Sequence, residues 1–292
     1  MQTAVNPTAN ALVDAAPEAE IDALADLLRD RPLTVLAGAG LSTESGIPDY
    51  RSPRSTPRTH RPILHDEFVR DPDARQRYWA RSAVGYARVA RAEPNAGHRA
   101  LAAMEARGAV AGVITQNVDG LHHAAGSRSV VELHGALRRV RCLGCGAVSS
   151  RDALQARLAA LNPDHLATVS PEAPTRPDGD VALPRAAICA FRVPGCTACG
   201  GVLMPDVVFF GGSVPKPTVQ AAWDLYASGA ALLVVGSSLA VFSGYRFVLR
   251  AEKDGKPAAL VTLGETRADA RVALKVSAPL GEALPALAAR LR

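Results

Sequence analysis

The stretch VLAGAGLSTESGIPDYR, residues 35–51, decides the fold. The apolar run Leu33–Ala37 predicts a buried strand, and this strand ends in Gly38 and Gly40, two glycines separated by Ala39. Glycines at such a place let the backbone press against a pyrophosphate. A strand followed by Gly-x-Gly is also typical of a plain tight turn, so the glycines alone leave both interpretations open.

The residues after Gly40 limit the classes of enzyme that this loop could belong to. Thr43 stands three positions after Gly40, where the dinucleotide fingerprint of hydride-transfer enzymes has a third glycine, and this disfavours a dehydrogenase. Asp49 and Arg51 flank Tyr50 directly after a proline. A charged pair on a loop beside a phosphate cradle favours a role in holding a cofactor over a role in packing.

Strand and helix patterns alternate along most of the chain. Further buried strands are predicted at 110–115, 130–133, 206–210, 231–235, 258–263 and 272–276, with helices at 18–29, 100–107, 217–228 and 283–291. This alternation predicts an α/β fold, a Rossmann-like doubly wound parallel sheet. We assign residues 18–137 and 203–292 to this nucleotide-binding domain and residues 1–17 to a disordered tail.

Residues 138–202 break this rhythm and are expected to form a small inserted zinc-ribbon module, with a helical part contributed by residues 52–94. The pairs Cys142-x-x-Cys145 and Cys196-x-x-Cys199 are each followed by glycine. Four thiolates on tight turns suit a closed, structural zinc site, and the alternative is a redox dithiol. Cys189 is left over and is expected to be a plain, at least partly buried thiol.

Composition limits the partners and the compartment. The chain has 33 basic and 28 acidic residues spread along its length, which indicates an ordinary solvated surface and disfavours a nucleic-acid partner. No run of about 18 apolar residues occurs, so no membrane span is expected. Paired cysteines favour a metal in a reducing compartment over disulfides, and the first 17 residues lack Lys and Arg. A cytoplasmic protein is therefore expected.

Two further sets of polar side chains follow predicted strands. Gln116, Asn117 and Asp119 come directly after the strand at 110–115, where parallel sheets bind ligands, although an Asx turn closed by glycine would look the same. His134 ends the strand at 130–133, and the glycine behind it leaves room for a substrate. A histidine suits a general base near neutral pH, whereas a lone histidine is more often an ordinary residue.

Taken in order, these segments resemble the sirtuins, the NAD-dependent protein lysine deacylases. The matching motifs are GAGLS (38–42), GIPDYR (46–51), TQNVDGLH (115–122), ELHG (132–135), PDVVFFG (205–211) and VVGSSL (234–239), together with the cysteine pairs. The resemblance runs from about residue 21 to the C-terminus. It implies NAD as co-substrate, one structural Zn²⁺, and acylated-lysine proteins or peptides as partners.

The resemblance also assigns roles to residues. It implies that His134 is the general base and that Asn117 and Asp119 hold the ribose and the nicotinamide carboxamide. The implied NAD-binding set is Gly38, Ala39, Gly40, Ser42, Thr43, Asp49, Tyr50, Arg51, Gln116, Asn117, Asp119, Gly236, Ser237, Ser238, Thr262, Gly264 and Leu280. The implied wall of the acyl-lysine tunnel, with an edge for the substrate peptide, is Val207, Val208, Phe209, Phe210 and Gly211.

Three positions depart from the family pattern. Gly212 stands where an acidic residue usually follows Gly211, Thr262 stands in place of an asparagine, and Leu280 stands in place of a cysteine. These changes are expected to alter contacts with the peptide or the affinity for NAD. Tyr50 and the segment 191–195 look most similar to class II sirtuins, the group that contains the mitochondrial lipoamidase and ADP-ribosyltransferase type.

The implied reaction removes an acyl group from lysine. In the family, the acyl carbonyl oxygen attacks the nicotinamide ribose and nicotinamide leaves. The histidine base then deprotonates a ribose hydroxyl, which attacks the resulting imidate, and hydrolysis gives free lysine and O-acyl-ADP-ribose. Residues 49–60 are expected to close over NAD as a lid. Two alternatives remain at this point: a protein mono-ADP-ribosyltransferase that uses the same NAD site, and a non-catalytic zinc-ribbon protein that binds nucleic acid. The preferred acyl group, the protein substrates and the oligomeric state stay open.

Overall fold

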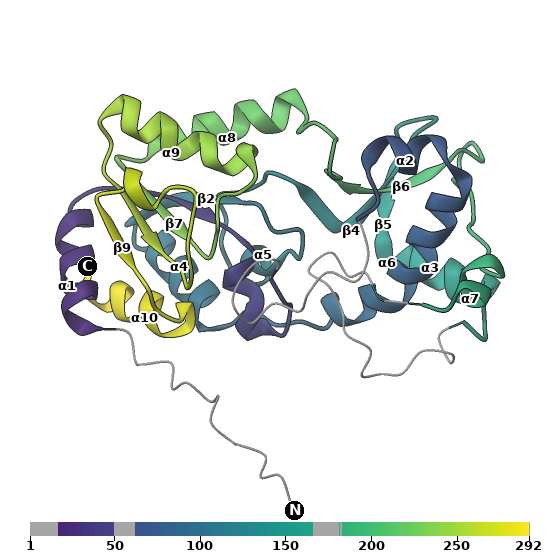
Figure 1. Cartoon of the computed structure of the whole chain (residues 1–292), viewed down its shortest axis with the longest axis horizontal. Coiled ribbons are helices and arrows are strands. Elements are labelled where there is room, and N and C mark those ends of the chain that lie inside the picture. Colours follow the sequence, from purple (N-terminus) through teal and green to yellow (C-terminus); the bar gives the residue numbers. More distant parts are fainter. Residues whose placement is uncertain (1–16, 50–61, 166–180, 182, 292) are drawn as a thin grey trace, which may run out of the picture.

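The structure is a computed structural model that describes residues 17–49, 62–165, 181 and 183–291. Its two lobes lie side by side along the long axis of the molecule (Figure 1). The predicted disordered tail, apart from its last residue, lies outside the described residues. So do Tyr50, Arg51 and nearly all of the predicted lid.

The larger lobe is built on a six-stranded sheet with the order β3-β2-β1-β7-β8-β9. Every neighbouring pair is parallel, which confirms the predicted sheet. The strands are β1 (Leu33–Ala37), β2 (Val110–Thr115), β3 (Val130–Glu132), β7 (Ala231–Val235), β8 (Ala258–Val261) and β9 (Leu274–Val276). The chain builds outward from β1 in one direction and from β7 in the other, so the order reverses between these two strands.

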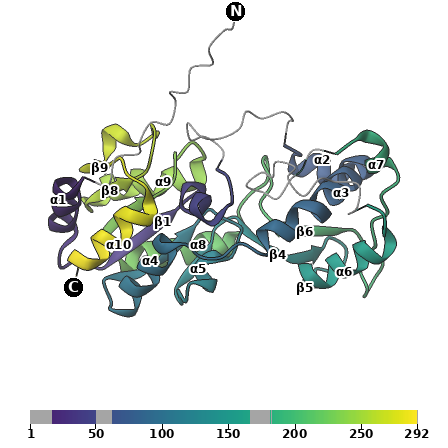
Figure 2. The same ribbon diagram turned by 90° about the horizontal axis from the view of Figure 1, so that it is seen from below.

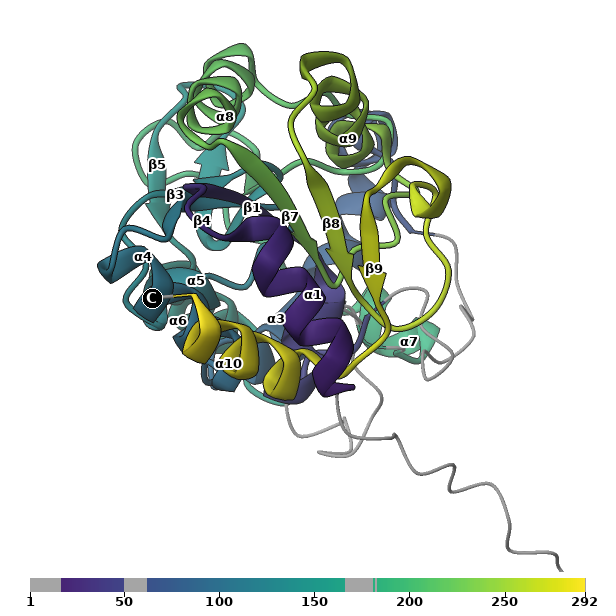
Figure 3. The ribbon, with the colours of Figure 1, turned by 90° about the vertical axis from the view of Figure 1, so that its left-hand side faces the viewer.

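Helices cover both faces of this sheet (Figure 3). The helices α1 (Glu18–Leu28), α4 (Ala96–Ala106) and α10 (Leu280–Arg290) pack on one face, and α8 (Lys216–Ser228) and α9 (Phe242–Asp254) pack on the other. Alternate strand residues face opposite layers: Val35 belongs to the first core and Leu36 to the second, both fully buried. This two-sided burial explains why the strands read as continuous apolar runs rather than as alternating ones.

The smaller lobe contains an antiparallel sheet with the order β5-β4-β6. Its strands are β4 (Gly135–Cys142), β5 (Val148–Ser150) and β6 (Leu203–Val207), and its helices are α2 (His65–Arg70), α3 (Pro72–Val89), α6 (Arg151–Leu161) and α7 (Arg185–Cys189). Figure 2 shows α2, α3, α6 and α7 gathered at this end of the molecule. Phe68 and Trp79 are fully buried in its core, and the Trp79 indole donates a hydrogen bond to the backbone of Leu203.

The prediction was wrong about the strand at 206–210. The strand that forms is β6, which ends at Val207 and pairs antiparallel with β4 in the smaller lobe instead of joining the parallel sheet. An apolar run predicts a strand but not its partner, and β4 was not predicted because Arg138, Arg139 and Arg141 interrupt its apolar pattern. The pairing of Gly135 with Val207 brings the end of β6 next to the residue after His134.

Helix boundaries differ from the predictions where a cap decides them. The predicted helix 100–107 begins earlier, at Ala96, because the Asn95 side chain accepts hydrogen bonds from the N–H groups of Gly97 and His98. The predicted helix 283–291 begins at Leu280, directly after a proline. Short elements among the described residues include α5 (Leu121–Ala124) and the 3₁₀ helices η1 (Ala39–Ser45) and η3 (Asp269–Arg271). None of the described helices is long and apolar enough to cross a membrane.

Candidate active site

A cavity of about 590 Å³ lies at the carboxyl ends of the strands, at the point where the strand order reverses. Parallel sheets bind ligands at this position because the loops diverge there and leave a crevice. Loops after β1, β2, β3, β7 and β8 all contribute lining residues, and the segment after β6 adds the wall toward the smaller lobe.

The glycines after β1 allow two loops to meet. A Cβ on Gly38 would lie 2.6 Å from the Cβ of Ser237, and a Cβ on Gly40 would lie 2.9 Å from the Gly236 carbonyl oxygen. The N–H of Gly40 donates to that same carbonyl over 2.8 Å. The backbones after β1 and β7 are therefore in direct contact, which only glycine permits here, and both loops border the cavity.

Asn117, Ser42 and Asp119 form a hydrogen-bond chain between two loops. The Asn117 amide donates to the Gly38 carbonyl over 3.0 Å and to the Ser42 hydroxyl over 3.1 Å. The Ser42 hydroxyl in turn donates to the Asp119 carboxylate over 2.7 Å, and the Leu121 N–H donates to its other oxygen. Burial raises the pKa of Asp119, and these two hydrogen bonds act in the opposite direction.

His134 is held at both ring nitrogens. Its Nδ1 lies 2.9 Å from the Gln116 carbonyl oxygen and its Nε2 lies 2.7 Å from the Ser243 hydroxyl at the start of α9. Burial lowers the pKa of His134, the bond to Gln116 opposes this, and the positive charge of Arg246 adds to the lowering. A neutral imidazole at neutral pH follows, which is the form that can accept a proton.

The segment after β6 forms the wall toward the smaller lobe. Val207, Val208, Phe209, Phe210 and Gly211, the residues predicted to form the wall of the acyl-lysine tunnel, all line the cavity. The N–H of Val208 donates to the His134 carbonyl over 2.8 Å, so this wall is tied to the histidine. Phe209 stacks on Phe68 with ring centroids 5.1 Å apart, which fixes the apolar surface beside His134.

Some predicted residues lie away from the cavity. The Thr43 hydroxyl donates to the Gly40 carbonyl, Gly264 supplies a turn with φ of 83°, and Leu280 packs in the core beneath the sheet. None of these three lines the cavity. The predicted residues that do line it are Gly38, Ala39, Gly40, Ser42, Asp49, Gln116, Asn117, Asp119, His134, Gly236, Ser237, Ser238 and Thr262.

The structure adds lining residues that sequence reasoning missed. Ser243 and Arg246 come from the first turns of α9, and Tyr78 comes from α3. Gly244 is buried against Gln116, where a Cβ would lie 2.5 Å from the amide oxygen. The sequence carried one signal for the start of α9: Ser243 and Gly244 stand between the aromatic residues Phe242 and Tyr245, directly after the loop that follows β7.

The four predicted zinc ligands converge in the smaller lobe. The sulfur atoms of Cys142, Cys145, Cys196 and Cys199 all lie within 4.8 Å of one another. Two of the sulfur pairs, Cys142 with Cys199 and Cys145 with Cys196, are 3.5 and 3.9 Å apart. Tetrahedral zinc with Zn–S bonds of about 2.3 Å requires sulfur separations of about 3.8 Å, so the cluster fits Zn²⁺.

Backbone N–H groups support this fit. Those of Gly144 and Gly201 point at the Cys142 and Cys199 sulfurs, 3.3 and 3.4 Å away. Hydrogen bonds of this kind stabilise thiolates, the form of cysteine that binds metal. Cys189 lies outside the cluster and is exposed, so its predicted burial was wrong.

The chain is similar to a known family over most of its length. The family model described as "Sir2 family" matches residues 38–243. An "NAD-dependent protein deacetylase 1" of Streptomyces coelicolor is 51% identical over 269 residues, which is 92% of this chain and 89% of the relative. An "NAD-dependent protein deacylase Sirt4" of Drosophila melanogaster is 48% identical over 92% of this chain and 87% of the relative.

Solved structures show the same similarity. One described as "Structural Basis for the Mechanism and Regulation of Sir2 Enzymes" aligns with a TM-score of 0.73 and 30% identity, over 94% of this chain and 98% of that chain. One described as "Sir2-p53 peptide-NAD+" aligns with a TM-score of 0.71 and 29% identity, over 90% of this chain and 95% of that chain. The match of the family model, the identity to its curated relatives and the shared fold show that the chain belongs to the Sir2 family.

Proposed function

We infer that the protein is an NAD-dependent protein lysine deacylase, which removes an acyl group from lysine to give nicotinamide and O-acyl-ADP-ribose. The relatives named above are NAD-dependent deacetylases and deacylases. The observation that carries the inference is that His134, Asn117 and Asp119 share one cavity with the apolar wall 207–211. His134 and the loop after β2 thus face the same cavity as an apolar wall suited to an acyl-lysine side chain.

The residues of this chain fit NAD in two ways. First, the loops after β1 and β7 border the cavity near the start of η1, where backbone can approach the phosphates of NAD. Second, Ser42, Ser237 and Ser238 add hydroxyl groups to the cavity. When bound, NAD supplies the ribose carbon that accepts the acyl oxygen and the ribose hydroxyl that takes over the acyl group. Asn117 and Asp119 are proposed to orient the nicotinamide ribose.

His134 is proposed to act as the general base. The Gln116 carbonyl can only accept a hydrogen bond, so Nδ1 carries the proton and Nε2 offers its lone pair. The base accepts the proton of the ribose hydroxyl at Nε2, and Gln116 then continues to accept from Nδ1. Phe209 and the rest of the wall 207–211 give the cavity an apolar surface on the side of the smaller lobe.

We also propose the division of the chain into an NAD-binding domain, residues 18–137 and 203–292, and a zinc module, residues 138–202, with a helical part of the smaller lobe contributed from within 52–94. Because β6 pairs with β4 in the smaller lobe, the second boundary is better placed after Val207. The six parallel strands lie between residues 33 and 276 but skip the segment that carries the four cysteines, which supports this division. The described cysteines are all free, which supports a reducing compartment, and we propose the cytoplasm. The class II assignment remains a proposal supported by the similarity to Sirt4.

The test is mass spectrometry of the purified protein with NAD and a panel of peptides that carry acetyl, succinyl, glutaryl, lipoyl or long-chain acyl lysine. Loss of one acyl group only with NAD, together with a matching O-acyl-ADP-ribose, is expected. Nicotinamide release with ADP-ribose attached to protein would instead identify a mono-ADP-ribosyltransferase. Absence of NAD consumption with every peptide would overturn both enzymatic proposals.

The variant His134→Ala assigns the base. Deacylation is expected to be abolished while the thermal unfolding midpoint and NAD binding stay close to those of the wild type, because the ring is replaced inside a preformed cavity. Asn117 and Asp119 remain in place in this variant. Retained turnover would remove His134 from the mechanism.

A further inference from the structure

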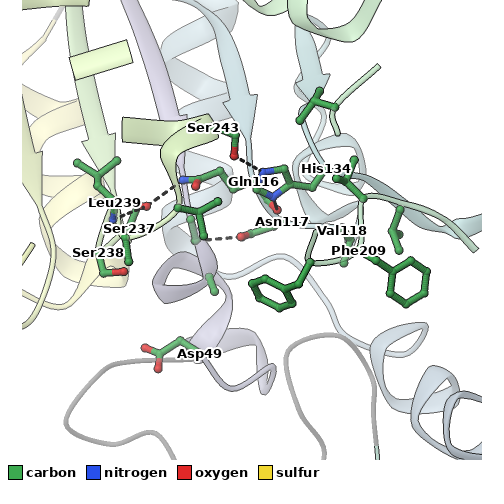
Figure 4. A pocket seen from close by; sticks show the side chains of 18 of the residues that line it. Asp49, Gln116, Asn117, Val118, His134, Phe209, Ser237, Ser238, Leu239 and Ser243 are labelled. Carbon is green, nitrogen blue, oxygen red and sulfur yellow. Dashed lines mark hydrogen bonds between the residues drawn. The ribbon is translucent and has the colours of Figure 1, made fainter. Parts of the chain in front are cut away.

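Ser243 is the residue that contacts the proposed base most closely on the cavity side. Its hydroxyl lies 2.7 Å from Nε2 of His134, a short distance for a hydrogen bond between a hydroxyl and a ring nitrogen. Ser243 lines the cavity, and the two residues stand 109 positions apart in the sequence. Figure 4 shows the serine directly above the histidine ring, with the interaction drawn between them.

The direction of this hydrogen bond follows from the other side of the ring. The Gln116 carbonyl oxygen accepts from Nδ1 over 2.9 Å, so in the neutral imidazole the proton is on Nδ1 and Nε2 is the acceptor. Ser243 must therefore donate. Its hydroxyl occupies the lone pair that would accept the ribose proton.

The first turn of α9 is built to place this hydroxyl. Arg246 Nε donates to the Ser243 carbonyl over 3.1 Å, and the Gly244 N–H donates to Val241. Gly244 is buried where a Cβ would lie 2.5 Å from the Gln116 amide oxygen, so glycine at this position leaves room for the Gln116 side chain where it lies in the structure. Gln116 is itself held by a hydrogen bond to Ser237.

We propose that Ser243 is a positioning residue for His134, an inference that rests on the proposed function. Its hydroxyl keeps the imidazole in the tautomer protonated on Nδ1, with Nε2 directed into the cavity, until the ribose hydroxyl of the co-substrate takes its place. In the proton transfer the serine turns away, Nε2 accepts the ribose proton, and the imidazolium continues to donate from Nδ1 to Gln116. The serine itself neither gains nor loses a proton.

Several charged groups act around this pair. Arg246 from α9 lowers the pKa of His134. Asp119 lies on the loop after β2 in the same cavity, and Glu132 at the end of β3 is paired with two arginines of β4. Asp206 of β6 is also paired with arginines, and Asp49 and Glu265 line the same cavity.

A hydroxyl that donates to Nε2 stabilises the neutral ring. Its removal is therefore expected to raise the pKa of His134, and deacylation, which needs the neutral ring, then requires a higher pH. The matched pair of variants is Ser243→Ala, which removes the hydroxyl, and Ser243→Thr, which keeps it.

The first measurement is ring-nitrogen NMR of isotope-labelled, ligand-free protein at neutral pH, with His134→Gln used to assign the signals. Nδ1 of His134 is expected to be protonated in the wild type and in both Ser243 variants. The Nε2 signal is expected to move toward that of a free imine nitrogen in Ser243→Ala and to return in Ser243→Thr. An unchanged Nε2 signal in Ser243→Ala would overturn the proposal, and this result is independent of whether the protein deacylates any peptide.

The second measurement is the pH dependence of kcat/KM with the best peptide of the panel. The acid limb is expected to move to higher pH by about half a unit or more in Ser243→Ala, with a several-fold loss of rate below neutral pH and near-normal rates above it. Nicotinamide release is expected to be unaffected, because the base acts after it. A loss that is equal at every pH, or that Ser243→Thr fails to restore, would show a packing effect and contradict the proposal.

Discussion

The hydroxyl of Ser42 and the carboxylate of Asp119 lie 2.7 Å apart, and this hydrogen bond joins the loop after β1 to the loop after β2 across 77 positions of sequence. Burial raises the pKa of Asp119, so ionisation of this carboxyl inside the cavity is unfavourable, and the hydrogen bonds from Leu121 and Ser42 offset part of that penalty. A buried carboxylate that a fold retains at such a site is a functional candidate.

Replacing Asp119→Asn tests this charge. The amide keeps the size of the side chain and one acceptor oxygen, so the thermal unfolding midpoint is expected to stay the same or rise. Deacylation is expected to fall by at least about tenfold, because the negative charge at the ribose is lost. Steady-state kinetics and thermal unfolding check both outcomes, and wild-type turnover in this variant would remove the charge from the mechanism.

Asn95 links the start of α4 to η1, the 3₁₀ helix that follows β1. Its amide oxygen caps the helix, and its amide nitrogen donates to the Leu41 carbonyl over 2.7 Å and to the Ser45 hydroxyl over 3.1 Å. Asn95→Ala is expected to cost about 1 kcal/mol of stability and to raise KM for NAD, because η1 loses its tether.

A matched control exists for this variant. Ser150 caps α6 in the smaller lobe with a side-chain hydrogen bond to the Asp152 N–H. Ser150→Ala is expected to cost a similar stability while leaving KM for NAD unchanged. Chemical denaturation and NAD titration compare the two, and equal effects on KM would show that Asn95 acts through stability alone.

The cysteine cluster predicts one zinc ion per chain. Metal analysis is expected to give a zinc content near stoichiometric, and chelation or Cys145→Ser is expected to lower the unfolding midpoint of the smaller lobe strongly, since its core includes Cys142 and Cys196. Cys189→Ser is the control, because this cysteine is exposed and outside the cluster. Unchanged zinc content in Cys145→Ser would contradict the assignment.

A buried histidine pair predicts loss of stability in acid. The rings of His98 and His122 lie 5.1 Å apart, and burial lowers the pKa of His98 to about 4 and that of His122 to about 3. His98 Nε2 and both ring nitrogens of His122 have no hydrogen-bond partner among the described residues. The unfolded chain, with histidine pKa values near 6.5, binds more protons than the folded one as pH falls.

Stability should therefore be complete above about pH 6.5 and decline as pH falls through about 4 and about 3, the folded-state pKa values of His98 and His122. Urea unfolding at a series of pH values measures this decline. His122→Phe removes one of the two groups and is expected to flatten the slope. The same slope in this variant would assign the acid sensitivity to other residues.

The sequence predicted the parts of the molecule that local pattern determines. Buried strands such as Leu33–Ala37 and the spacing of the cysteines can be recognised from the local sequence without knowing which segments they contact. Residues such as His134 could be placed because they directly follow a predicted strand. Ser243 was missed because its place depends on how closely α9 approaches Gln116, which a tertiary contact sets. The strand β4 was missed because its arginines interrupt the apolar pattern, and the carboxylates that pair with them, Glu132 and Asp206, lie on other strands.

The central claim is that the acyl group leaves lysine by transfer to the ribose of NAD. The most direct test uses a peptide whose acyl-lysine carbonyl carries heavy oxygen, with reaction in ordinary water and mass analysis of the products. We predict free lysine peptide and an O-acyl-ADP-ribose that retains one heavy oxygen from the carbonyl. Release of labelled free acid without labelled O-acyl-ADP-ribose would show simple hydrolysis and contradict the claim.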